Sequence, residues 1–235
     1  MLQLTGLSKR FGGIVAVENV GFAVGAGEIV GLIGPNGAGK TTLFNLISGH
    51  IRADTGRAMF GSVDLTRMRA AQCARAGIGR TFQIVRPLNS LTVLENVTVG
   101  ALLRNDVATA RRKAASIVER VGMADLIHRP TASLTLESRK RLEVARALAT
   151  EPRLLLLDEI LAGLTPREVN ESLAMIRGFA NDGLGVIMIE HILHAVMSVA
   201  DRVVVLDFGR MIAQGAPAEV VRDEKVIAAY LGANE

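Results

Sequence analysis

A glycine-rich loop near the amino terminus limits the folds open to this chain more than any other feature. It reads Gly34-Pro-Asn-Gly-Ala-Gly39-Lys40-Thr41, directly after the apolar run EIVGLI and directly before the helical pattern KTTLFNLISGHI. A strand, a G-x-x-x-x-G-K-T loop and a helix in this order are the context of a phosphate-binding P-loop. A glycine turn that caps a helix by accident is the other interpretation, but it leaves the spacing of the glycines and the lysine unexplained.

The residue types in this loop suit a nucleoside triphosphate. Glycines allow consecutive backbone N–H groups to converge on phosphate oxygens, and the positive end of the helix dipole favours the same anion. Lys40 would place a cation between the β- and γ-phosphates, and Thr41 would offer its hydroxyl to Mg²⁺. The predicted nucleotide contacts are Gly34, Pro35, Asn36, Gly37, Ala38, Gly39, Lys40, Thr41 and Thr42.

An acidic pair ends an apolar run far downstream, in the segment LLLLDE. A P-loop needs a second strand that carries a carboxylate for the metal, and Asp158 is placed for that role. Glu159, the next residue, would point toward the γ-phosphate as a general base or water-orienting group. A strand that ends in Asp-Glu is, on its own, more often a solvated strand end, so this prediction depends on the loop around Lys40.

The pattern of the chain predicts an α/β fold with a helical insertion. Short β-type runs at the amino terminus, with a hairpin turning at Gly61-Ser62, indicate an antiparallel β subdomain. From Thr92 to about Ala149 the periodicity is helical, and it opens with the capping box Thr92-Val-Leu-Glu95.

Continuous apolar runs then return, which is typical of parallel strands covered on both faces. These runs stand directly before Asp158, Glu190 and Asp207. We therefore expect one domain over residues 1–235, in which 1–85 and 150–235 form a nucleotide-binding core lobe and 86–149 form a helical lobe.

Composition fits a globular chain that stays in a reducing compartment. With 235 residues, 49% of them hydrophobic, the chain can bury one substantial core. Cys73 is the only cysteine, which predicts a cytosolic protein. No apolar run approaches the roughly 18 residues that cross a bilayer, and we expect no secretion signal.

The positive charge has several interpretations. The formal net charge is +4, and basic residues cluster within helical patterns, at Arg111-Arg112-Lys113 and Arg139-Lys140-Arg141. Such clusters indicate solvated faces or contact with an anionic membrane surface. Aromatic residues make up only 3% of the chain, with no tryptophan, which disfavours stacking on single strands, so no nucleic-acid partner is predicted.

These residues together resemble ABC-type ATPases, the subunits that drive ATP-binding-cassette transporters. The loop at 34–42, Gln83, the segment LTLES at 134–138, the acidic strand at 154–159 and His191 follow the family's order and approximate spacing over nearly the whole chain. The resemblance implies a P-loop NTPase (RecA-like) core with an amino-terminal antiparallel β subdomain and an inserted helical lobe. It also implies ATP and Mg²⁺ as ligands.

The resemblance assigns roles to three further residues. Phe11 matches the aromatic that stacks on adenine, Gln83 matches the glutamine that reaches the metal and the attacking water, and His191 matches the histidine at the γ-phosphate. Phe11 could instead be a strand aromatic in a core. Taken alone, a glutamine and a histidine at these places would more often be a surface polar residue and a helix-start or packing residue. The implied catalytic residues are Glu159, His191, Gln83 and Lys40, and the implied metal ligands are Thr41, Gln83 and Asp158.

The segment LTLES departs from the family's Leu-Ser-Gly-Gly-Gln motif, which begins a helix and faces the nucleotide of a partner subunit. Thr135 keeps a hydroxyl, whereas Leu136 and Glu137 replace both glycines and Ser138 replaces glutamine. The substitutions add bulk and a negative charge where backbone should approach phosphate. A second departure is Thr165, which stands where the family has aspartate but still opens a capping box with proline next to it.

The opening FGGIVAVENV and the ending VVRDEKVIAAYLG look most like the LivG-type branch of the family, which serves branched-chain amino acid import. The implied partners are transmembrane permease subunits, a paralogous ATPase subunit in a heterodimer (or a second copy in a homodimer) and, indirectly, a solute-binding protein. The implied location is the cytoplasmic face of the cell membrane.

Two other functions remain open from the sequence. An ABC ATPase that acts on nucleic acid or ribosomes would need a coiled-coil insertion or a second cassette, and the interval of about 95 residues from Lys40 to Thr135 has no room for a heptad arm. A signalling GTPase or small-molecule kinase would leave LTLES and His191 unexplained, and the chain has no Asn-Lys-x-Asp segment.

Overall fold

A six-stranded sheet forms the centre of the molecule, seen here in a computed structural model that describes residues 1–82 and 87–231. Its strand order is β11-β10-β4-β9-β8-β7, with every neighbouring pair parallel except β10 and β11. This arrangement confirms the α/β prediction. The strands are β4 (Ile29–Ile33), β7 (Ile78–Arg80), β8 (Leu154–Asp158), β9 (Gly185–Ile189), β10 (Arg202–Asp207) and β11 (Arg210–Gly215).

The inner strands of this sheet are buried on both faces, as their continuous apolar runs predict. In β4, Ile29 and Ile33 belong to one core, whereas Val30 and Leu32 belong to a second core on the opposite face. Successive side chains of a strand point to opposite faces, so a strand covered on both sides must be apolar throughout.

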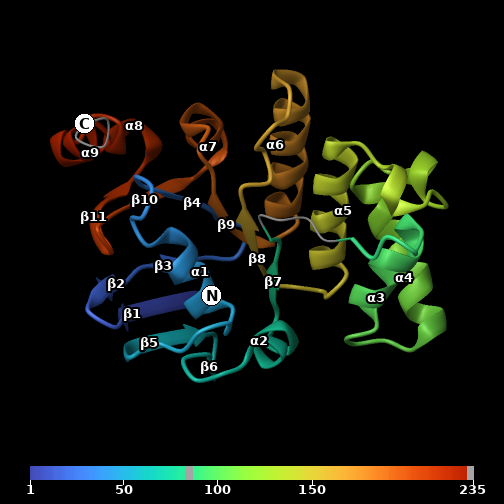
Figure 1. The fold of residues 1–235 in the computed structure, drawn as a ribbon, viewed down its shortest axis with the longest axis horizontal. Helices are drawn as coiled ribbons and strands as arrows, with labels where there is room; N and C mark the ends of the chain where they lie inside the picture. Colours follow the sequence, from blue (N-terminus) through green and yellow to red (C-terminus); the bar gives the residue numbers. More distant parts are fainter. Residues whose placement is uncertain (83–86, 232–235) are drawn as a thin grey trace.

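A smaller antiparallel sheet lies below the central one (Figure 1). Its hairpin turns at Gly61-Ser62 as predicted, and Gly61 takes a positive φ of 58° there. The strands are β1 (Leu2–Phe11), β2 (Ile14–Val20), β3 (Ala23–Val24), β5 (Thr55–Phe60) and β6 (Val63–Asp64).

Three helices gather at one side of the central sheet (Figure 1). They are α3 (Val93–Ala101), α4 (Val107–Arg120) and α5 (Leu136–Leu148). The predicted capping box is confirmed: the Thr92 N–H donates to Glu95 Oε2 at 2.8 Å, and the Glu95 N–H donates to Thr92 Oγ1 at 3.3 Å. The helical periodicity from Thr92 to about Ala149 is not continuous, because Gly122, with φ at 73°, follows the end of α4 and a short 3₁₀ turn, η1 (Ala124–Leu126), comes next.

The remaining helices cover the central sheet or lie at its edges. The capping box at Thr165 is confirmed, with Pro166 in the first helical position of α6. No helix among residues 1–82 and 87–231 is long and apolar enough to cross a membrane. The elements are α1 (Lys40–Ile47), α2 (Ala70–Ala76), η2 (Thr131–Ser133), α6 (Pro166–Asn181), α7 (Leu193–Val199), α8 (Pro217–Val220) and α9 (Glu224–Leu231).

Candidate active site

The glycine-rich loop connects β4 to α1 and is held between two other strands. Gly34 has φ at 149°, and a Cβ there would lie 2.0 Å from the carbonyl oxygen of Leu206 at the end of β10. Gly39 has φ at 99°, and a Cβ there would lie 2.3 Å from the carbonyl oxygen of Ala16 in β2. Both positions therefore require glycine, for conformation and for space.

Lys40 is buried at the first position of α1, with 7% of its surface exposed. Its Nζ donates to the carbonyl oxygens of Gly34 at 2.7 Å and Pro35 at 2.9 Å, so the side chain folds back over the loop. Burial lowers the pKa of Lys40, and the nearby carboxylates of Glu159 and Asp158 oppose that shift. An anion brought to the loop would offer this ammonium stronger acceptors than two carbonyl groups.

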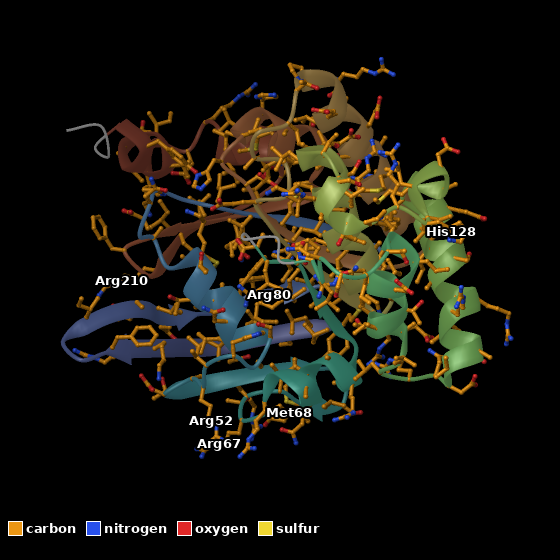
Figure 2. The ribbon with its side chains drawn as sticks, turned by 45° about the vertical axis from the view of Figure 1, so that its right-hand side comes forward. Arg52, Arg67, Met68, Arg80, His128 and Arg210 are labelled. Atoms are coloured by element: carbon orange, nitrogen blue, oxygen red, sulfur yellow. The ribbon has the colours of Figure 1, made fainter. Side chains whose placement is uncertain are left out.

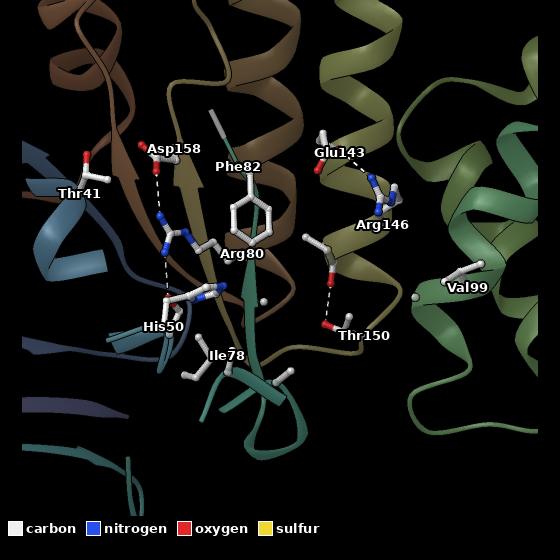
Figure 3. A pocket seen from close by; sticks show the side chains of 16 residues that line it. Thr41, His50, Ile78, Arg80, Phe82, Val99, Glu143, Arg146, Thr150 and Asp158 are labelled. Atoms are coloured by element: carbon white, nitrogen blue, oxygen red, sulfur yellow. Dashed lines mark hydrogen bonds and ion pairs between the residues drawn. The ribbon is translucent and has the colours of Figure 1, made fainter. Parts of the chain in front are cut away.

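Asp158 ends β8 and is 3% exposed. Arg80, at the end of neighbouring β7, donates from Nη2 to Asp158 Oδ2 at 3.1 Å (Figure 3). The Asp158 N–H donates to Thr81 Oγ1 at 3.0 Å. Burial raises the pKa of Asp158, and the Arg80 guanidinium opposes that rise. The carboxylate is thus held in place by a cation that the sequence did not single out.

Arg80 makes several contacts besides this ion pair. It donates to Asn45 Oδ1 at 2.6 Å and to Ser48 Oγ at 2.9 Å, and its guanidinium lies 5.2 Å from the ring centre of Phe82. Figure 2 shows Arg80 in the interior of the molecule, whereas Arg67 and Arg210 project from its periphery. The signal for Arg80 in the sequence is weak, because it is a single arginine at the end of a strand, close to Gln83.

Thr41 and Asp158 line one cavity of about 790 Å³ (Figure 3). Their hydroxyl and carboxylate oxygens are the donors that Mg²⁺ prefers, so the residues fit the metal. Within the two described stretches of the chain, no group of three or more His, Cys, Asp or Glu residues could hold a metal by itself. Gln83, the third predicted ligand, lies outside the described residues.

Glu159 and His191 meet above the ends of β8 and β9. His191 Nε2 lies 2.8 Å from Glu159 Oε1, although the two residues are 32 positions apart in the chain. Glu159 takes the left-handed conformation, with φ at 51°, and its N–H donates to the carbonyl oxygen of Ile189 at 2.9 Å. The structure therefore brings together two residues to which the resemblance assigns separate catalytic roles.

Two buried charged residues near Glu159 were not predicted. Lys140 was read as part of a solvated basic cluster, but it is 8% exposed and its Nζ donates to the carbonyl oxygen of Glu159 at 2.7 Å. Glu190, 4% exposed, accepts the Leu161 N–H at 2.8 Å. Burial raises the pKa of Glu190 to about 7. Whether a charged side chain of a helix points inward depends on the elements packed against that helix. The burial of Lys140 was therefore not predicted from the sequence.

The segment LTLES begins α5 as predicted. Thr135 is the N-cap and its Oγ1 accepts the Ser138 N–H at 3.3 Å, while Glu137 forms an ion pair with Arg141 at 2.6 Å. Leu136 is 50% exposed. The Thr135 hydroxyl already caps its own helix, and a leucine and a glutamate stand where the family motif has glycines.

Phe11 lies at the end of β1, 49% exposed, with Lys9 Nζ 5.5 Å from its ring centre. The adjoining strand β2 contacts the P-loop through Ala16, as the space around Gly39 shows. Phe11 thus belongs to the hairpin of β1 and β2 beside the glycine-rich loop, and its ring is half exposed rather than buried in the core.

A P-loop between a parallel strand and a helix, with an acidic pair at the end of another strand of the same sheet, defines the class of P-loop nucleoside triphosphatases. The comparison with known families is more specific. The family model described as ABC transporter matches residues 17–162, which is more than half of the chain. This chain therefore belongs to the ABC transporter family, among its ATP-binding cassettes.

Individual relatives cover nearly the full length. The high-affinity branched-chain amino acid transport ATP-binding protein LivG of Escherichia coli (strain K12) is 37% identical over 99% of this chain and 98% of its own. The lipopolysaccharide export system ATP-binding protein LptB of the same strain is 35% identical over 98% of this chain and 97% of its own. Residues 210–235 also match a model described as branched-chain amino acid ATP-binding cassette transporter.

A solved structure agrees with the fold. The ADP conformation of MJ1267, an ATP-binding cassette of an ABC transporter, superposes with a TM-score of 0.90 at 32% identity, over 99% of this chain and 98% of that one. This cassette is thus similar to the present chain in both sequence and architecture.

Proposed function

We propose that this chain hydrolyses ATP to power the import of branched-chain or related amino acids through a separate membrane permease. The contact between His191 and Glu159 carries the proposal. His191 also lines a cavity of about 920 Å³ with Gly34, Pro35, Asn36, Gly37 and Ala38, so a phosphate held by the loop would lie beside this pair. A carboxylate and an imidazole in this position suit the orientation of an attacking water.

Each predicted residue then has a role in phosphoryl transfer to water. Lys40 binds the β- and γ-phosphates, and Thr41 and Asp158, with Gln83, hold Mg²⁺. The metal, when bound, neutralises the charge that develops on the phosphates. Glu159 orients the water and His191 contacts the γ-phosphate. Phe11 stacks on adenine.

The partners follow from the family. We infer that the chain works at the cytoplasmic face of the cell membrane with permease subunits, and indirectly with a solute-binding protein. The division into a core lobe (1–85 and 150–235) and a helical lobe (86–149) belongs to the same proposal. Closure on ATP would move the helical lobe, and this motion would be passed to the permease.

The substrate class rests on the names of the relatives and on the match over residues 210–235. LptB, at 35% identity, is named for lipopolysaccharide export, so cassette similarity alone does not select the cargo. The permease and the binding protein select it.

Reconstitution tests this function. We expect membrane permease subunits to co-purify with the chain. In lipid vesicles, the assembly should hydrolyse ATP in preference to GTP. The vesicles should take up labelled leucine but not labelled lysine. Uptake should stop when ATP is withheld. Hydrolysis stimulated by nucleic acid or ribosomes, in a chain that brings down no permease, would replace this proposal with the non-transport one.

We further propose that the ATPase partner is a paralogous subunit rather than a second copy. Leu136 and Glu137 occupy the first two positions of α5, where the family motif exposes backbone to the partner's nucleotide. A partner with an intact motif would complete the Lys40 site of this chain, while the site that LTLES faces would be the weaker one.

Changing both Leu136 and Glu137 to glycine should therefore raise ATP hydrolysis by the mixed dimer about threefold, which corresponds to about 0.7 kcal/mol. Steady-state phosphate release measures the effect. The matched control changes Val107 and Ala108 to glycine, because these residues hold the same two positions of α4 and Val107 is 69% exposed. A rate that stays at the wild-type value in the glycine variant of α5 contradicts the asymmetric dimer.

A further inference from the structure

A buried lysine of the helical segment reaches the backbone of the residue that we assign to water orientation. Lys140 lies in the second turn of α5, and its Nζ donates to the carbonyl oxygen of Glu159 at 2.7 Å. It is 8% exposed, unlike its neighbours in the basic run, Arg139 and Arg141, which are only partly buried. Lysine is seldom buried to this degree unless the charge is compensated, so this contact is a specific one.

The backbone that Lys140 holds is unusual. Glu159 has φ at 51°, a conformation that costs a residue with a side chain roughly 1 kcal/mol and persists only where the surroundings fix it. Its N–H is bonded to the Ile189 carbonyl at 2.9 Å, and its carbonyl is bonded to Lys140. The two bonds fix the peptide groups on both sides of the Glu159 Cα, and thereby the direction in which its side chain leaves the backbone.

A buried acid that interacts electrostatically with Lys140 holds the next part of the same loop. Glu190 is 4% exposed, it interacts electrostatically with Lys140, and it accepts the Leu161 N–H at 2.8 Å. Lys140 and Glu190 therefore hold residues 159 and 161, which lie two positions apart in the same loop. Glu190 also immediately precedes His191, so the arrangement supports both members of the Glu159–His191 pair.

The start of α5 contacts this loop a second time. A Cβ at Gly163 would lie 2.9 Å from Leu136 Cδ2, so the first residue of α5 packs directly against the chain four residues after Glu159. A shift of α5 relative to the central sheet would disturb both this contact and the Lys140 bond. The position of the helix and the geometry of Glu159 are thus mechanically linked.

We propose that Lys140 is a positioning residue that fixes the backbone of Glu159 and makes the aim of its carboxylate depend on the position of α5. The proposal rests on the function proposed above, because it assigns Glu159 to the attacking water. Binding of nucleotide to the P-loop does not involve Lys140. Loss of the Lys140 bond should therefore slow hydrolysis and leave nucleotide affinity unchanged.

The experiment compares Lys140→Met, which keeps the length of the side chain, with Lys140→Arg, which keeps the charge and a donor. We expect Lys140→Met to lower kcat at least about tenfold, because a misplacement of about 1 Å can cost about a hundredfold in rate. KM for ATP and the Kd of a fluorescent ADP analogue should change less than about twofold, whereas Lys140→Arg should recover most of kcat. Amide hydrogen exchange of the peptide covering 158–163 should speed up in Lys140→Met.

Lys113→Met is the matched control, because Lys113 lies in the neighbouring helix α4 and its ion pair with Glu151 is exposed. Its kcat should equal that of the wild type. If Lys140→Met does not fold, the double change Lys140→Met with Glu190→Gln removes both buried charges and keeps an acceptor for the Leu161 N–H. This variant should show the same low kcat.

Three results would overturn the assignment: an unchanged kcat in Lys140→Met, a parallel loss of kcat and nucleotide affinity, or no recovery in Lys140→Arg. Each of them leaves the proposed function in place, since the wild-type chain with its partner subunits still hydrolyses ATP. A wild-type assembly without ATP hydrolysis overturns the proposed function itself, and the role of Lys140 with it.

Discussion

Replacing Glu159 with glutamine should lower the rate of ATP hydrolysis at least about a hundredfold, which is the lower range for removal of a general base. The substitution keeps the size of the side chain, and the backbone bonds to Ile189 and Lys140 do not involve the carboxylate. The neutral amide can still contact His191, but it has no charge with which to polarise water. Nucleotide binding should stay within about twofold of the wild type, because the P-loop is unchanged.

Single-turnover hydrolysis and equilibrium binding of a fluorescent ATP analogue, measured on the same preparation, separate these two effects. Glu119→Gln is a suitable control, since Glu119 is an exposed residue of α4 far from the site in the chain. It should hydrolyse ATP at the wild-type rate. A Glu159→Gln chain that retains more than about a tenth of the wild-type rate would remove Glu159 from the reaction.

The elements that the sequence predicts well are those whose signal is local. The P-loop is a contiguous motif, the capping boxes at Thr92 and Thr165 each span one helical turn, and the apolar runs of β8 and β9 need burial on both faces whatever their partners are. The order of the strands was not predicted, because parallel strands joined by helices allow several orders in the sheet. Local chemistry therefore sufficed to predict the fold class and the place of the glycine-rich loop between a strand and a helix.

The residues that the sequence reading missed act across long distances in the chain. Arg80 meets Asp158 from 78 positions away, and Glu190 meets Leu161 from 29 positions away. Lys140 also looks like any other member of a basic run, and only the packing of α5 shows that it points inward. Side chains that support a site are set by tertiary contacts, which leave no periodic pattern in the sequence.

The segment LTLES has one feature that the sequence predicts and one that it does not. The sequence places the segment at the start of a helix, and the structure agrees, because Thr135 is a good N-cap in any protein. The packing of Leu136 against Gly163 depends on two segments of one fold, and no motif contains it.

Replacing Lys40 with methionine should weaken ATP binding about ten- to a hundredfold, because a hydrogen bond to a charged group contributes about 1.5–3 kcal/mol. The fold should survive the change. Among the described residues, Lys40 Nζ donates to the Gly34 and Pro35 carbonyls of the loop, and its burial already disfavours the ammonium, as the lowered pKa indicates. Removal of a desolvated charge offsets the loss of these two bonds, so the melting temperature should move little.

Binding of a fluorescent ATP analogue and thermal unfolding, each measured with and without Mg²⁺, test the two halves of this prediction separately. Lys113→Met, which removes an exposed lysine of α4, should retain both properties. Because Lys40 would contact phosphate oxygens directly, its loss should weaken binding in the presence of EDTA as well as with the metal. Loss of Asp158, a proposed metal ligand, should weaken binding only with Mg²⁺. If the affinity falls less than about threefold in Lys40→Met, the loop does not bind the triphosphate. The roles proposed for Asp158, Glu159 and His191 would then be wrong as well, because each of them requires a nucleotide bound at this loop.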